Sequence, residues 1–172
     1  MKCVLAAIAA ILSLAIARPA AAALAVGDPA PDFSAPGTQG GTIMKVDLAE
    51  LLKKGPVVLY FFPSAFTETG ESREFAENID NFRAAGVSVV GMSRDSVDTL
   101  ARLSTEQCAG KFPMASAGES IVNAFDVNDG AMFNTRTTYV VAPSARILFV
   151  HDDDDFSGHV KSALAFVQGM NK

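Results

Sequence analysis

The stretch from Val57 to Phe75 is the part of this chain whose layout is best suited to chemistry. It opens with a continuous apolar run, Val57–Phe62, which predicts a strand buried on both faces. Pro63 ends that strand, and a charged segment with helical spacing begins near Thr69 or Gly70. Backbone N–H groups and the helix dipole stabilise an anion at the first turn of such a helix, so a reactive group is expected there. The position that invites one holds no cysteine, serine or histidine.

Other side chains that could do chemistry do not combine into a recognisable site. The hydroxyl groups just before the predicted helix, those of Ser64, Thr67 and Thr69, have no identifiable His–Asp partners, which argues against a serine-type hydrolase. His151 and His159 flank the acidic run Asp152–Asp155, but consecutive carboxylates in one loop cannot all face one ion. We interpret this run as a solvated acidic turn with both histidines at the surface. The sequence therefore predicts no metal site and no cofactor.

The sequence contains two cysteines, Cys3 and Cys108. Cys3 lies in an N-terminal apolar segment that is expected to be removed, so the mature chain carries one thiol. A single thiol excludes an internal disulfide, a C-x-x-C redox pair and a cysteine-rich metal site.

Residues 1–25 are typical of a signal peptide. Lys2 precedes an apolar run of about 15 residues, which is too short for a comfortable membrane span, and small residues suited to cleavage follow near Ala23 or Ala25. An uncleaved anchor is the alternative. Removal of Lys2 and Arg18 changes the formal net charge from −5 to about −7, and so acidic a domain disfavours nucleic acid and anionic lipid as partners. We expect an exported protein, in a bacterial periplasm or secreted, with no membrane association after cleavage.

Residues 26–172 predict one α/β domain with a central mixed sheet flanked by helices. Residues Val26–Phe33 are predicted to be an extended lead-in, and residues 37–42 are predicted to form a turn. The predicted strands are 43–46, 57–62, 87–92, 112–115, 137–141 and 147–150, and the last two form an antiparallel hairpin. The predicted helices are 48–54, 72–85, 97–108, 120–125 and 160–170.

Several motifs, in this order, make the chain resemble the peroxiredoxins of the AhpC/TSA type, closest to the PrxQ-like (bacterioferritin-comigratory) branch. The residues that carry the resemblance are Val26–Phe33, Val57–Thr67, Val89–Ser96, Lys111–Met114 and Arg136–Val141. The resemblance implies a thioredoxin-like sandwich. It also implies reduction of hydroperoxides with electrons from a thioredoxin-like reductant, by a monomer or a homodimer.

The active-site motif of that family is Pro-x-x-x-Thr-x-x-Cys, with a glutamate three residues after the cysteine. The resemblance places Pro63, Thr67 and Arg136 in the pocket, where the proline excludes water and the threonine and arginine assist the attacking thiolate. An ungapped comparison with this motif puts Gly70 at the position of the family's cysteine. We prefer a deletion of two residues between Thr67 and Glu71, which removes the cysteine and makes Glu71 the family glutamate. Either way, the peroxidatic thiol is absent.

Each of these residues also has a plainer interpretation. Arg136 could make a surface ion pair, Thr67 could cap the following turn, and the Glu68/Glu71 pair could be only a charge effect at the start of a helix. By the same resemblance, Cys108 matches the resolving cysteine of some PrxQ-like members, left without the attacking cysteine with which it would pair. The alternative is a half-buried helix residue without a redox role.

Three functional hypotheses follow. In the first, the chain is an exported peroxiredoxin relative whose peroxide-reducing activity is lost or weak. In the second, it is a non-catalytic binding or interaction module that uses the pocket of Pro63, Thr67 and Arg136 for a small anion or a partner. In the third, the two-residue gap near Thr69 is a sequence error and the real protein is an ordinary peroxidase.

Overall fold

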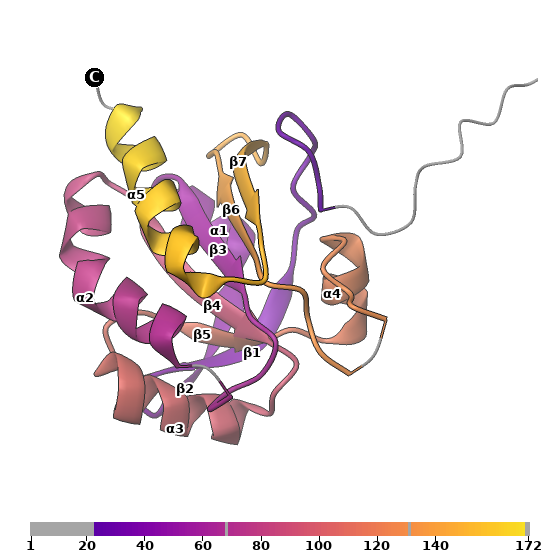
Figure 1. Cartoon of the computed structure of the whole chain (residues 1–172), viewed down its shortest axis with the longest axis vertical. Coiled ribbons are helices and arrows are strands. Elements are labelled where there is room, and N and C mark those ends of the chain that lie inside the picture. The colour runs from indigo at the N-terminus through magenta and orange to yellow at the C-terminus, as the bar shows by residue number, and fades with distance from the viewer. Residues whose placement is uncertain (1–22, 68, 131, 171–172) are drawn as a thin grey trace, which may run out of the picture.

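The computed structural model of the chain describes residues 23–67, 69–130 and 132–170. They form a seven-stranded mixed sheet, in the order β2-β1-β5-β4-β3-β6-β7, with helices on both faces (Figure 1). The strands are β1 (Ser34–Gln39), β2 (Thr42–Asp47), β3 (Val57–Phe61), β4 (Ser88–Ser93), β5 (Met114–Ser116), β6 (Thr137–Val141) and β7 (Ile147–Asp152). The helices are α1 (Leu48–Leu52), α2 (Gly70–Ala84), α3 (Val97–Cys108), α4 (Glu119–Ala124), the 3₁₀ turn η1 (Phe156–Gly158) and α5 (His159–Gly169). The predicted mixed α/β sandwich is confirmed.

Strand β3 lies in the middle of the sheet, and all five of its residues are buried. It pairs in parallel with β4 and antiparallel with β6. Val58 and Tyr60 face the core under α2, α3 and α5, whereas Leu59 and Phe61 face the core under α1 and α4. The uninterrupted apolar run in the sequence is therefore explained by burial on both faces.

Local sequence signals gave helix positions close to the observed ones. Helix α3 spans Val97–Cys108 as predicted, and its start is capped by the Ser96 hydroxyl, which accepts from the Thr99 amide. Helix α2 begins at Gly70 and buries Phe75 and Phe82 on its apolar face. The parallel pairing of β3 with β4 across α2 is also confirmed.

The stretch predicted as turn residues 37–42 is instead mostly strand. Gly37 lies within β1, opposite Met44 of β2 and Ala115 of β5, and only Gly40 and Gly41 form the turn. A Cβ atom at position 37 would lie 2.5 Å from the Met114 carbonyl oxygen, so glycine serves close packing between strands here. The sequence pattern also missed η1 and the inclusion of Asp152 in β7.

The pairing of the strands brings three distant segments to one end of the sheet. Phe61 at the end of β3 is opposite Thr137 at the start of β6, and Thr137 is opposite Asp152 at the end of β7. The loop after β3, the residue before β6 and the segment after β7 therefore meet. None of the helices in the described ranges is long and apolar enough to cross a membrane.

Candidate functional site

A cavity of about 380 Å³ opens where these three segments meet. Among the described residues its lining consists of Pro63, Ser64, Thr67, Phe133, Arg136 and Asp154. The structure thus brings together the three pocket residues that the sequence singled out, and it adds Ser64, Phe133 and Asp154. Ser64 lies within the Val57–Thr67 motif, but at a position that the family pattern leaves unspecified. Phe133 and Asp154 lie outside the motifs, and they reach the cavity because separate loops pack together.

Thr67 uses its hydroxyl within its own loop. The hydroxyl donates to the Ser64 carbonyl oxygen at 2.8 Å, and the side chain is exposed at the rim of the cavity. Phe66 beside it has a φ of +65°, a left-handed conformation that is uncommon outside glycine. The hydroxyl therefore closes the turn that ends at Thr67, whereas the plainer interpretation placed it as a cap of the turn that follows.

The loop that carries Thr67 is tied to the end of β4 by Asp95. The Asp95 carboxylate accepts from the Ala65 amide at 2.7 Å and from the Ser93 hydroxyl at 2.7 Å. Asp95 was not among the candidate site residues, although it lies within the Val89–Ser96 motif. Only the tertiary contact with Ala65 shows that this carboxylate positions the cavity loop.

Arg136 is buried, with 4% of its side chain exposed, and forms an ion pair with Glu71, whose side chain is 1% exposed. Its Nε also donates to the Asp154 carbonyl oxygen at 3.1 Å. The interpretation of Arg136 as a surface ion pair is therefore wrong. The interpretation of Glu71 as only a helix-start charge effect is also wrong, because its carboxylate is removed from solvent and charge-paired across the site.

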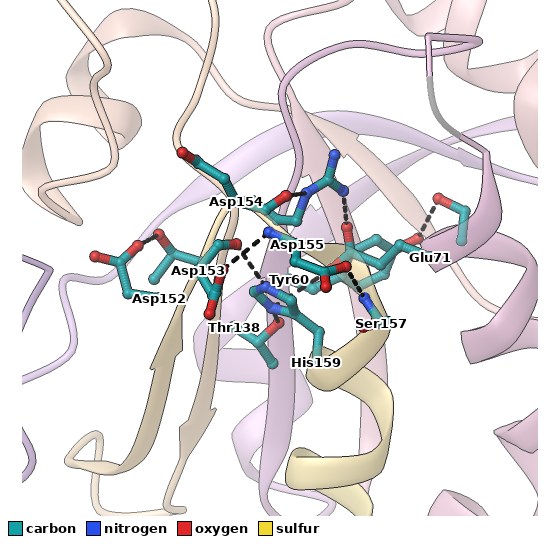
Figure 2. Close-up of polar contacts among 12 residues, drawn as sticks. Tyr60, Glu71, Thr138, Asp152, Asp153, Asp154, Asp155, Ser157 and His159 are labelled. Atoms are coloured by element: carbon teal, nitrogen blue, oxygen red, sulfur yellow. Dashed lines mark hydrogen bonds and ion pairs between the residues drawn. The ribbon is translucent and has the colours of Figure 1, made fainter.

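His159 continues this polar cluster into the core (Figure 2). Its Nε2 lies 2.9 Å from the Asp153 carbonyl oxygen, which can only accept, so Nε2 carries a proton. In the neutral ring Nδ1 then accepts from the Thr138 hydroxyl at 2.8 Å, and it lies 3.7 Å from a Glu71 oxygen. The prediction of a surface position is wrong for His159, which is fully buried.

Burial lowers the pKa of His159 below its ordinary value of 6.5, and the charges of His151 and Arg136 act in the same direction. His151 is half-buried, and its ring meets that of His159 edge-on at 4.5 Å. Within the described ranges no three His, Cys, Asp or Glu residues are grouped so that they could hold a metal ion.

Cys108, the last residue of α3, is fully buried and does not line the cavity. Its Sγ lies 3.7 Å from the Ser72 carbonyl oxygen in the first turn of α2. Burial raises the pKa of the Cys108 thiol to about 12, so this thiol is protonated at neutral pH. The alternative described Cys108 as half-buried, whereas the structure buries it completely.

Comparison with known proteins gives a consistent set of relatives. A family model described as the AhpC/TSA family matches residues 26–150. A Mycobacterium tuberculosis protein (strain ATCC 25618 / H37Rv) that is named among the peroxiredoxins is 32% identical over 152 residues, which are 84% of this chain and 96% of the relative. Peroxiredoxin Bcp of Escherichia coli (strain K12) is 26% identical over 145 residues, covering 79% of this chain and 90% of the relative.

Solved structures agree with these sequence matches. The crystal structure of peroxidoxin BcpB from Mycobacterium tuberculosis superposes with a TM-score of 0.79 at 29% identity, over 86% of this chain and 98% of that one. A mutant of PrxQ from Xylella fastidiosa superposes with a TM-score of 0.76 at 23% identity, over 88% and 99% of the two chains, and it supports the fold.

Proposed function

This chain belongs to the AhpC/TSA family of peroxiredoxins, and from that membership we propose that it is a relative whose peroxide-reducing activity is lost or severely weakened. Members of the family act on hydroperoxides with thioredoxin-like reductants. The proposal is that this copy keeps the fold and the pocket while the attacking thiol is missing.

One observation carries the proposal: among the described residues no thiol lines the cavity, and their one cysteine, Cys108, is buried elsewhere with a raised pKa. Peroxide reduction needs a thiolate, which attacks one oxygen of the O–O bond while the other oxygen leaves as an alcohol or water. With its pKa raised by burial to about 12, the Cys108 thiol stays protonated at pH 7. Cys108 is therefore a poor substitute for the missing nucleophile.

Arg136 also has a structural role. Its Nη1 binds Glu71 and its Nε donates to the Asp154 carbonyl oxygen, so it joins α2 to the segment after β7.

The test is peroxide consumption by the purified chain with a thioredoxin-like reductant. We expect turnover indistinguishable from the reductant alone, and no change on Cys108→Ser. Turnover at rates usual for thiol peroxidases, abolished by Cys108→Ser, would overturn the proposal and make Cys108 the nucleophile.

The intact mass and thiol count of the natural protein provide a second check. They test whether two residues, one of them cysteine, are missing from the sequence near Thr69. A mass that matches the printed sequence supports the proposal. Two additional residues including a thiol would indicate an ordinary peroxidase.

The second candidate is a non-catalytic binding module, which is favoured by the cavity itself. The lining includes the apolar side chains of Pro63 and Phe133 and the polar side chains of Ser64 and Asp154, so the cavity offers both apolar and polar contacts. Thermal shift with small oxyanions and with neutral alcohols would reveal a ligand. Phe133→Ala should abolish such a shift, and the exposed Glu50→Ala, away from this cavity, is the matched control. No shift with any probe would count against this candidate.

A further inference from the structure

Gly70, the first residue of α2, packs directly against the aromatic ring of Phe156 in η1. A Cβ atom at position 70 would lie 2.7 Å from Phe156 Cε2 and 2.9 Å from Cζ. Separations below 3.0 Å are essentially never seen for a real Cβ, so a side chain at position 70 and the present position of this ring exclude each other.

The ring of Phe156 is held in place by the residues around it. The Arg136 guanidinium lies over it, with Cζ 5.9 Å from the ring centroid, and Arg136 Nε donates to the Asp154 carbonyl oxygen. The Asp155 carboxylate accepts from the Ser157 amide at 3.0 Å, and His159 Nε2 donates to the Asp153 carbonyl oxygen. Residues 153–158, which we call the closing segment, are thus fixed on both sides of the ring.

We propose that Phe156 closes the first turn of α2, so that position 70 has to be glycine for the closing segment to dock. The significance for the site rests on the proposed function, in which position 70 is one of two candidates for the lost cysteine. In that case a single substitution to cysteine would not rebuild a reactive site, because the new Cβ would displace the closing segment.

The decisive experiment is a thermal-unfolding cycle on the full chain with Gly70→Ala, Phe156→Ala and the double variant. Alanine is a better helix former than glycine, so without the ring Gly70→Ala should leave the Tm unchanged or slightly higher. With the ring present, we expect a fall of about 3 to 10 °C from overpacking. Gly169→Ala, where a Cβ meets nothing within 4 Å, is the matched control and should stay within about 2 °C of the parent.

Hydrogen exchange of the closing segment is the second readout. Gly70→Ala should accelerate exchange in residues 153–158 by about tenfold or more, because it loosens the docking of η1. Gly169→Ala should not. The proposal is overturned if Gly70→Ala changes the Tm equally with and without Phe156, or if exchange in the segment is unaffected. Neither readout depends on peroxide turnover, so failure of the proposed function and failure of this inference are told apart.

Discussion

The ion pair between Arg136 and Glu71 is the residue-level feature on which the site depends most. Both side chains are almost completely removed from solvent. Desolvation of two charges offsets much of their attraction, so such a pair adds little net stability compared with apolar residues. Loss of one partner is different, because it leaves an uncompensated charge in the core.

Arg136→Ala is therefore expected to reduce the free energy of unfolding by about 3–5 kcal/mol, since Glu71 is then buried without its guanidinium. Urea unfolding followed by circular dichroism measures this change. The double variant Arg136→Met/Glu71→Leu should lose much less than either single alanine variant. A loss below about 1 kcal/mol for Arg136→Ala would contradict a buried pair.

His159 should make stability depend on pH. Its folded pKa is lowered, so the unfolded chain binds more protons between that value and the ordinary 6.5. The contribution of His159 to the free energy of unfolding is therefore fully present above about pH 6.5. It is lost as the pH falls from there through the folded pKa. The charged or titratable groups that face the ring are Glu71, Arg136, His151 and the carboxylates of Asp153 and Asp155.

The measurement is urea unfolding at intervals between pH 5 and pH 8. His159→Gln should flatten the dependence in that range. His151→Gln, on a half-buried neighbour, is the control and should largely keep it. A dependence that survives His159→Gln unchanged would mean that another group is responsible.

Among the elements, the loop after β3 is held to the end of β4 by the Asp95 carboxylate and by the backbone bond from the Phe62 amide to the Met92 carbonyl oxygen at 3.0 Å. Asp95 accepts hydrogen bonds from the Ala65 amide and the Ser93 hydroxyl. Hydrogen bonds to a charged acceptor contribute about 1.5–3 kcal/mol each. The orientation of Pro63 and Thr67 at the cavity therefore depends on β4 as well as on β3.

Asp95→Ala should release this loop and accelerate hydrogen exchange of the peptide that contains Ala65 by about tenfold or more. Strand β3 should keep its protection, because its hydrogen bonds to β4 and β6 are intact. Asp98→Ala, an exposed residue in the first turn of α3, is the control. Unchanged exchange at Ala65 in Asp95→Ala would show that the loop is held by other contacts.

At the scale of the whole molecule, the core includes Leu24, which precedes the extended lead-in Val26–Phe33. Leu24 is 8% exposed, and its amide donates to the Tyr139 hydroxyl at 3.0 Å. The Tyr139 hydroxyl in turn donates to the Phe125 carbonyl oxygen, which joins the N-terminal segment to β6 and α4. Residues 1–22, which make up most of the proposed signal peptide, lie outside the described residues.

For the proposed export, these contacts favour cleavage after Ala23 over cleavage after Ala25, because the latter would remove Leu24 from the core. N-terminal sequencing of the exported protein should therefore begin at Leu24. A chain that begins at Val26 would require the Tyr139 hydroxyl to find another partner. Retention of residues 1–22 in the mature protein would instead support an anchor.

Most of the fold could be predicted from the sequence because its signals are local. The buried run at β3, the amphipathic spacing of α2 and the cap of α3 are each contained in a short window. The ordered motifs likewise pointed to the peroxiredoxin family, which the comparisons bear out. The strand at Gly37 was not predicted, because glycine in a sequence is typical of a turn. Only the structure shows that Gly37 allows β5 to pack closely against β1.

The candidate site divides in the same way. The sequence by itself determined that the pocket residues Pro63, Thr67 and Arg136 are present and that no cysteine accompanies them. Only the tertiary structure decided that Arg136 is paired with Glu71, that His159 is buried and that Phe156 covers Gly70. The physical reason is that burial and charge pairing depend on residues far apart in the chain, which local periodicity does not register.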